Sequence, residues 1–185
     1  WMNMLASRGQ LRASFIRWAL FTVPLCVLLG FLAGRLGSPD TAWFAALEKP
    51  GIFPEPKWFG IVWTILYIMI GLAVAVVASA WGARGRSTAL WVFAIHFLLN
   101  LSWSYVFFGA QQITGGLIVL ALIVLTLLAV IALFWRVRKL AGALLLPYLA
   151  WVLFASVLNY QFLQLNPDAD GGDANGAVER VRIGN

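Results

Sequence analysis

The sequence predicts an all-α integral membrane protein, a bundle of five transmembrane helices. Of its 185 residues, 62% are hydrophobic and only 11% are charged, whereas soluble domains are about 45–50% apolar and about 25% charged. Four long segments contain no charged residue at all. Because these segments are long and continuously apolar, they favour helices over the short alternating strands of a membrane barrel.

The uncharged segments divide the chain into helices. Those at residues 18–34, 58–83 and 140–167 each predict one spanning helix, since a helix crosses the bilayer core with about 20 residues. The segment at 87–135 is long enough for two helices, and "GAQQITGG" (residues 109–116) supplies glycines for the break between them. We therefore predict helices at about 16–36, 58–81, 88–108, 113–135 and 140–163.

Two terminal segments flank the predicted transmembrane domain, residues 16–166. Residues 1–15 carry Arg8 and Arg12 among apolar side chains, a pattern typical of a short interfacial helix. A flexible leader is the alternative for this basic segment. Residues 167–185 are polar and rich in glycine and acidic residues, a composition that predicts a disordered tail.

The longest connection, residues 37–57, predicts a lid over one end of the bundle. Its four prolines prevent one continuous helix, but "TAWFAALEK" is able to form two helical turns with Trp43 and Phe44 on one side. Long loops in compact proteins are often functional lids. An interfacial anchor for the aromatic residues is the other interpretation, and the two are compatible.

The distribution of basic residues predicts an orientation in the membrane. Eight Lys and Arg residues fall on the side of the N-terminus, and five fall on the opposite side. The positive-inside rule then places the N-terminus in the cytoplasm and the C-terminus outside. The same rule explains the net charge of +6, so the lipid bilayer is the expected partner and nucleic acid is not.

Three of the predicted helices carry aromatic and polar residues on one face. The spacings of three and four residues place each set on a single side of its helix. An unpaired amide in hydrocarbon costs several kcal/mol, so the asparagines must point into the bundle. The sets are Trp63 and Tyr67 on the second helix, His96, Asn100, Trp103 and Phe107 on the third, and Tyr148, Trp151, Ala155 and Asn159 on the fifth.

Two interpretations of these faces stay open at the level of single residues. For each asparagine, a hydrogen bond between helices explains the residue as well as ligand binding does. For His96, an interior histidine with satisfied hydrogen bonds is favoured over a ligand or a proton carrier. The convergence of three faces favours a pocket for a flat, largely apolar ligand, since such pockets combine aromatic walls with a few polar groups.

Other functional classes find little support in the sequence. The chain has one histidine, no acidic residue within a predicted helix, and no spacing typical of a catalytic triad or a metal site. We therefore expect no catalytic residue, no bound metal and no ion or proton pump. Gly30 and Gly34 form a GxxxG pattern, which permits close helix approach either in a homodimer or inside the bundle.

Four stretches together resemble one known family, the translocator proteins, also called tryptophan-rich sensory proteins or peripheral benzodiazepine receptors. The resemblance runs in order from Trp43 to Asn166. The stretches are "WFAALEKP" (43–50), "FGIVWTILY" (59–67), "LNLSWSYVFFG" (99–109) and "LPYLAWVLFASVLNYQFLQLN" (146–166).

This resemblance implies a five-helix bundle, often dimeric, with a pocket beneath the first loop. It implies a receptor, sensor or transport-regulating protein of the bacterial inner membrane that binds a porphyrin- or haem-type tetrapyrrole and needs no obligatory cofactor. An interaction subunit of a larger membrane complex and a porphyrin-modifying enzyme are the alternatives. The family's pocket positions fall on Trp63, Tyr67, Asn100, Trp103, Trp151, Ala155 and Asn159.

The full set of expected ligand-binding residues adds five positions to those seven. Trp43 and Phe44 belong to the loop, while Phe107 and Tyr148 belong to the helix faces. His96 stands where many members of the family have glutamine, and we expect it to form a polar wall of the pocket rather than to bind a porphyrin metal.

Overall fold

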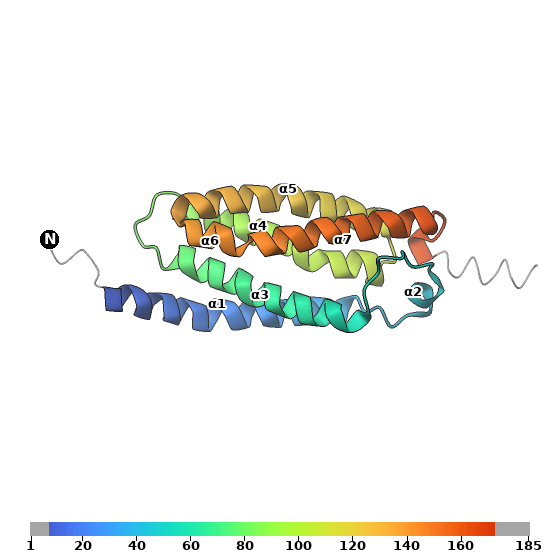
Figure 1. Cartoon of the computed structure of the whole chain (residues 1–185), viewed down its shortest axis with the longest axis horizontal. Helices are drawn as coiled ribbons and strands as arrows, with labels where there is room; N and C mark the ends of the chain where they lie inside the picture. Colours follow the sequence, from blue (N-terminus) through green and yellow to red (C-terminus); the bar gives the residue numbers. More distant parts are fainter. Residues whose placement is uncertain (1–7, 173–185) are drawn as a thin grey trace, which may run out of the picture.

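The computed structural model describes residues 8–172, and this part of the chain is helical without strands. Five long helical spans run side by side in alternating directions (Figure 1). Each is long and apolar enough to cross a membrane, which confirms the predicted fold class. The elements are α1 (Arg8–Leu36), α2 (Ala42–Ala46), α3 (Pro56–Ala78), α4 (Arg86–Ser104), the π-helix η2 (Tyr105–Gly109), α5 (Ile113–Val137), α6 (Lys139–Leu144), α7 (Leu146–Leu165) and η3 (Asp170–Gly172).

The two ends of the chain differ from the sequence-based prediction. Helix α1 begins at Arg8, so residues 8–15 are its first turns rather than a separate interfacial helix or a flexible leader. The stretch contains good helix formers and no proline. The predicted disorder of residues 167–185 is wrong for 167–172, which include η3. Residues 1–7 and 173–185 lie outside the described part.

The fifth predicted helix is divided in two. Helix α6 ends at Leu144, and α7 starts at Leu146 with a proline in its first turn. Pro147 has no backbone N–H and is therefore tolerated best at the start of a helix. The two pieces together still form one apolar span, Lys139–Leu165.

Glycines allow α1 to lie directly against its neighbours. A Cβ atom on Gly71 of α3 would come within 2.6 Å of the Cα of Val23, and the Thr22 hydroxyl donates a hydrogen bond to the Gly71 carbonyl at 2.7 Å. A Cβ on Gly30 would come within 2.3 Å of the Tyr67 ring. Gly30 therefore packs tightly inside the bundle, whereas a Cβ on Gly34 would meet nothing within 4 Å; a homodimer through the GxxxG pattern stays a prediction.

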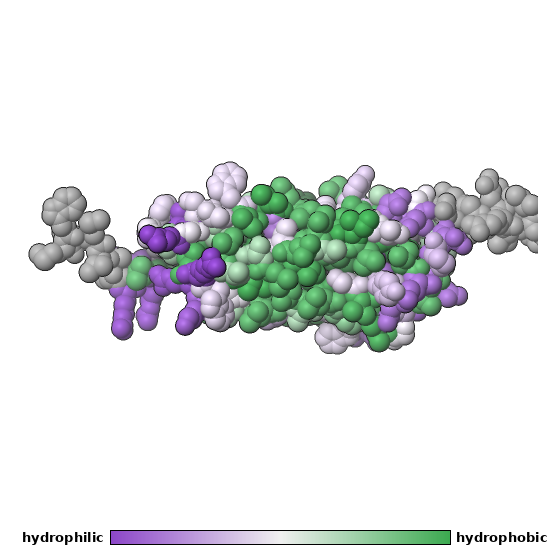
Figure 2. Space-filling view, turned by 90° about the horizontal axis from the view of Figure 1, so that it is seen from above, coloured by the Kyte–Doolittle hydropathy of each residue, from purple (hydrophilic) through white to green (hydrophobic). Residues whose placement is uncertain are grey.

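The surface has an apolar middle and polar ends. Figure 2 shows hydrophobic side chains over the central part of the bundle and hydrophilic ones at its two extremities. This distribution matches a bilayer core between two aqueous faces. Large tryptophans are exposed near the helix ends, where indole rings favour the membrane interface; they are Trp58, Trp81, Trp91 and Trp135.

Candidate functional site

A cavity of about 480 Å³ lies inside the bundle, below the loop that contains α2. Its walls come from α1, α3, α4, η2, α5 and α7. The size falls within the range of about 300–1,000 Å³ that is usual for small-molecule pockets. Five lining residues are exposed, namely Gly34, Pro39, Asp40, Pro56 and Gly60. They mark an opening between the end of α1 and the start of α3.

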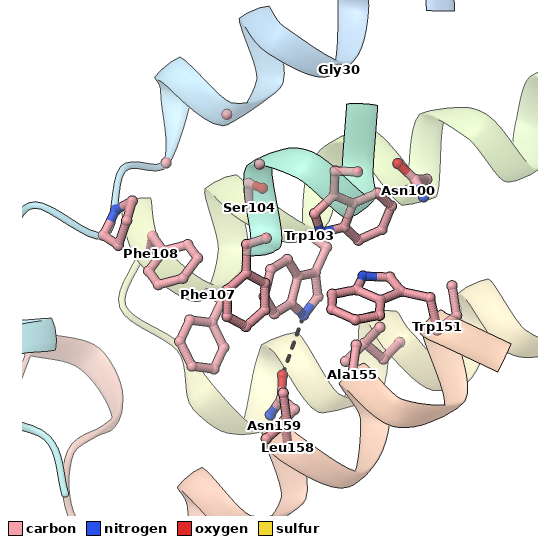
Figure 3. Close-up of a pocket in the computed structure, with 18 of the residues that line it drawn as sticks. Gly30, Asn100, Trp103, Ser104, Phe107, Phe108, Trp151, Ala155, Leu158 and Asn159 are labelled. Atoms are coloured by element: carbon pink, nitrogen blue, oxygen red, sulfur yellow. Dashed lines mark hydrogen bonds between the residues drawn. The ribbon is translucent and has the colours of Figure 1, made fainter. Parts of the chain in front are cut away.

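Aromatic rings form most of the cavity wall. Figure 3 shows Trp103, Phe107 and Trp151 directed toward the same space. Trp103 stacks on Phe107 with ring centroids 5.1 Å apart, and Trp63 meets Trp151 edge to face at 6.4 Å. These pairs hold the rings in their orientations, because an offset-stacked or edge-to-face contact between two rings adds stabilising free energy to that of their burial.

The π-helix η2 shapes one side of the cavity. The Ala110 N–H donates to the Tyr105 carbonyl, five residues earlier, at 2.7 Å, so this turn is wider than an α-helical turn. Two successive residues, Phe107 and Phe108, line the cavity from this turn. Single π turns are rare and occur frequently at functional sites.

The loop of residues 37–57, here called the lid, packs on the bundle through its helix α2. Thr41 caps α2 by accepting a hydrogen bond from the Phe44 N–H at 3.1 Å. The Lys49 ammonium group donates to the carbonyls of Phe44 and Leu47 at the other end, at 2.8 and 2.9 Å. These caps satisfy the backbone of a helix too short to be stable alone. Trp43, Phe44 and Leu47 are buried against η2, α5 and α7.

The lid is attached to the end of α7 through Asn166. The side-chain oxygen of Asn166 accepts a hydrogen bond from the Glu48 N–H at 2.8 Å, and its amide group donates to the Glu48 carbonyl at 2.9 Å. Both backbone groups of one lid residue are thus satisfied by one side chain. This pairing mimics a strand ladder and holds the lid against the bundle.

Residues 166–172, here named the C-terminal strap, continue this attachment. The Trp43 indole N–H donates to the Ala169 carbonyl at 2.8 Å. The Asp170 carboxylate accepts from the N–H groups of Ile113 and Thr114 and from the Thr114 hydroxyl. A carboxylate at the N-terminus of α5 satisfies otherwise unpaired N–H groups and interacts favourably with the helix dipole.

A polar network lies beside the cavity. The Tyr67 hydroxyl donates to the Asn100 side-chain oxygen at 3.1 Å, and the Asn100 amide donates to the Tyr148 hydroxyl. Asn100 lines the cavity and is almost fully buried. Its orientation is set by tyrosines on α3 and α7.

His96 extends this network away from the cavity. Its Nε2 lies 2.9 Å from the Tyr148 hydroxyl, and its Nδ1 lies 2.7 Å from the Thr126 hydroxyl. The Thr126 hydroxyl already donates to the Leu122 carbonyl, so it accepts from Nδ1–H, and Tyr148 donates to Nε2. In this arrangement each O–H or N–H donates one hydrogen bond, and the imidazole of His96 is neutral because its Nε2 accepts. His96 is an interior histidine with satisfied hydrogen bonds.

Two further residues with polar side-chain groups, Asn159 and Trp151, line the cavity from α7. Asn159 donates to the Ile113 carbonyl at 2.9 Å and accepts from the Trp103 indole N–H at 3.2 Å, the contact drawn in Figure 3. The indole nitrogen of Trp151 is buried and has no hydrogen-bond partner among the described residues. A buried N–H without a partner costs about 1–3 kcal/mol, a cost that an acceptor on a ligand would relieve only if the ring turned to expose the nitrogen.

Nine of the twelve predicted ligand-binding residues line the cavity. The other three do not: Trp43 lies in the aromatic cluster around the lid, and His96 and Tyr148 are fully buried in the network beside the cavity. The expected polar wall at His96 is therefore absent, because the ring points toward α5 and α7. The nine are Phe44, Trp63, Tyr67, Asn100, Trp103, Phe107, Trp151, Ala155 and Asn159.

The sequence-based reasoning missed several lining residues. Phe59 precedes Trp63 by four residues and Phe162 follows Asn159 by three, so both extend faces already identified. Asp40 and Phe53 carry no such signal, since they come from the irregular part of the loop. Residues 8–172 hold no cluster of three or more potential metal ligands.

Comparisons with known proteins place this chain among relatives of one family. The sequence pattern of the TspO/MBR family matches residues 22–165. A tryptophan-rich protein TspO from Chlorobaculum tepidum is 43% identical over 151 residues, which cover 78% of this chain and 93% of the relative. A tryptophan-rich sensory protein from Cereibacter sphaeroides is 34% identical, covering 80% and 92%. The translocator protein of Homo sapiens is 35% identical, covering 70% and 78%.

Proposed function

The chain belongs to the TspO/MBR family, and from this premise we propose that it is a membrane receptor or sensor whose cavity binds a porphyrin-type tetrapyrrole. Relatives named as a sensory protein and a translocator protein support a role in signalling or transport regulation rather than in catalysis. The proposed output is regulation of tetrapyrrole or pigment metabolism, or of a stress response.

The observation that carries the binding proposal is the cavity of about 480 Å³ inside the bundle, with Trp151 among its aromatic lining residues. Flat rings from Trp63, Trp103 and Phe107 offer surfaces on which a planar macrocycle can stack. The Asn100 amide and, if its ring turned, the Trp151 N–H are the polar groups that would orient it. This combination of apolar area and few fixed donors is usual for small-molecule sites.

The lid supports a receptor rather than an open channel. Phe44 and Phe53 of the lid both line the cavity, so the lid is part of the binding surface. A ligand that fills the cavity would therefore contact the lid and the bundle at once. In this proposal the change in lid packing on binding is the signal, and no bond of the ligand is broken.

The proposed setting is the bacterial inner membrane with the N-terminus in the cytoplasm. The basic residues at the start of α1, between α3 and α4, and between α5 and α6 lie at one end of the bundle (Figure 1). The positive-inside rule supports a cytoplasmic location for that end. The lid and the cavity opening would then face the outer side.

Quenching of tryptophan fluorescence by protoporphyrin IX tests the proposal. We expect saturable quenching of the purified protein, and Trp151→Phe should weaken binding about tenfold because it removes the N–H donor together with part of the ring surface that lines the cavity. Trp91→Phe is the matched control, since Trp91 is 73% exposed and does not line the cavity. A wild-type protein without saturable quenching would refute the proposal. Absorbance spectra before and after illumination of the complex should be identical; a light-dependent product would instead indicate an enzyme.

A further inference from the structure

The end of the bundle opposite the lid is strongly basic. It holds eight Lys and Arg residues and no carboxylate of residues 8–172, because the acidic residues in this range all belong to the lid or the C-terminal strap. The one ion pair among the described residues joins Lys57 to Glu55 in the lid. Figure 2 shows hydrophilic side chains gathered at the basic end. Seven of the eight cationic residues are exposed, namely Arg8, Arg12, Arg17, Arg84, Arg136, Arg138 and Lys139.

Arg86, the eighth cationic residue, is half-buried and held in place at the start of α4. Its Nε–H donates to the Ala78 carbonyl at the end of α3 at 2.8 Å. Its guanidinium carbon lies 4.0 Å from the centre of the Trp81 ring and 5.9 Å from that of Trp18 on α1. One arginine side chain thus joins α1, the end of α3 and the connection between α3 and α4.

These contacts leave part of the Arg86 guanidinium group available to a ligand. Its Nε–H is used, while neither terminal amino group donates to an acceptor within residues 8–172. The planar fork of an arginine suits the paired oxygens of a phosphate group, and a guanidinium that already lies over an indole ring loses little freedom on binding. Trp81 beside it is 68% exposed, as is usual for tryptophans at the level of lipid headgroups.

We propose that this basic end binds the phosphate headgroup of an anionic phospholipid, with Arg86 as the specific contact and the seven exposed cationic residues as the source of longer-range attraction. Charge and position select this occupant. The basic end borders the apolar surface of the bundle (Figure 2), so one lipid can place its phosphate at Arg86 and its acyl chains on that surface. Basic pockets between transmembrane helices are known to bind anionic headgroups. The site is separate from the cavity, because Arg86 is not among the cavity's lining residues.

Two phospholipids with the same acyl chains and different headgroup charges test this inference. Dioleoyl phosphatidylglycerol is anionic, and dioleoyl phosphatidylcholine is zwitterionic. Native mass spectrometry of the full chain, titrated with each lipid in detergent, gives the two affinities. We expect the wild-type protein to prefer phosphatidylglycerol about tenfold and Arg86→Gln to lose about fivefold of this preference. Arg86→Lys keeps the charge without the planar fork and should lose less. Raised salt should weaken the preference.

Arg35→Gln is the matched control, because Arg35 also lies over an aromatic ring, Phe31 at 5.3 Å, but at the lid end of the bundle. It should leave the preference unchanged. Arg84→Gln removes an exposed cation two residues from Arg86 and should lower the preference about twofold. This variant retains the hydrogen bond between Arg86 and Ala78, so a folding defect in Arg86→Gln would not prevent a decision.

Three results would refute the lipid site. The first is equal binding of the two lipids by the wild-type protein, or equal effects of Arg86→Gln and Arg35→Gln. The second is displacement of phosphatidylglycerol by millimolar inorganic phosphate, which would indicate a site for a free ion. The third is an acidic protein that co-purifies with the wild type and is lost from Arg86→Gln while both lipids bind alike. Porphyrin affinity should be the same in Arg86→Gln and wild type, so the proposed function is tested separately.

Discussion

The indole nitrogen of Trp43 donates a hydrogen bond to the carbonyl oxygen of Ala169 across 2.8 Å. This contact joins the lid to the C-terminal strap, two segments 126 residues apart in the chain. Beside it, the side chain of Asn166 holds both backbone groups of Glu48. The closed position of the lid therefore depends on residues beyond the last transmembrane helix.

Removing the Trp43 hydrogen bond should loosen the lid. Trp43→Phe keeps an aromatic ring in the buried cluster but loses the donor, which should weaken lid closure by about 1 kcal/mol. Hydrogen exchange of the backbone amides in residues 41–53 should rise about fivefold relative to wild type. Trp58→Phe serves as the control because Trp58 is exposed. Equal exchange in the Trp43 and Trp58 variants would show that the strap does not hold the lid.

Replacing His96 should destabilise the protein and disturb the cavity indirectly. His96→Phe leaves the Tyr148 hydroxyl without its acceptor and Thr126 without its donor, which should lower the free energy of unfolding by about 2–4 kcal/mol. His96→Gln retains polar atoms and should cost less. The thermal unfolding midpoints of the two variants in detergent provide the measurement.

The His96 variants also distinguish a network role from a ligand role. His96 does not line the cavity, so any loss of porphyrin affinity should arise from a misplaced Asn100 and should be small in His96→Gln. If His96→Phe were as stable as wild type, the hydrogen-bond order through Tyr148 would be wrong. If His96→Gln abolished binding without loss of stability, direct contact between His96 and the ligand would follow.

Adding one methyl group at Gly37 should disrupt the close approach of the chain just after α1 to the end of α4. A Cβ atom there would lie 1.9 Å from the backbone oxygen of Ser104, and backbone cannot move aside as a flexible side chain can. Gly37→Ala should therefore reduce the free energy of unfolding by more than about 2 kcal/mol. Gly51→Ala is the matched control, since its Cβ would meet nothing within 4 Å. Similar unfolding midpoints for both variants would contradict the close approach.

Much of the candidate site follows from helical spacing in the sequence. The pairs Trp63 and Tyr67, and Asn100 and Trp103, and the series Trp151, Ala155 and Asn159 have intervals of three or four residues, and all of them line the cavity. Their polar atoms are unfavourable in contact with lipid, so the faces that carry them had to turn inward. The long apolar segments determined the number of spans in the same way.

Helical periodicity in the sequence could not predict other features of the site. His96 shares a helix face with Asn100, yet its ring turns to Thr126 and Tyr148 rather than to the cavity. Spacing defines which side of a helix a residue occupies, but the direction of its side chain depends on the partner atoms that neighbouring helices supply. The π turn at Phe107 and Phe108 is likewise invisible to a pattern of three and four.

By itself, the sequence determined a five-helix membrane bundle and the inward faces of three helices, because hydrophobic length and period act locally along the chain. It also placed most helix boundaries within a few residues, apart from the start of α1 and the division between α6 and α7. Only the tertiary structure decided that Gly30 packs on Tyr67, that residues 166–172 fasten the lid, and that Asp40 stands at the opening of the cavity. These features are contacts between segments distant in sequence, and they depend on the angles and separations at which the helices pack.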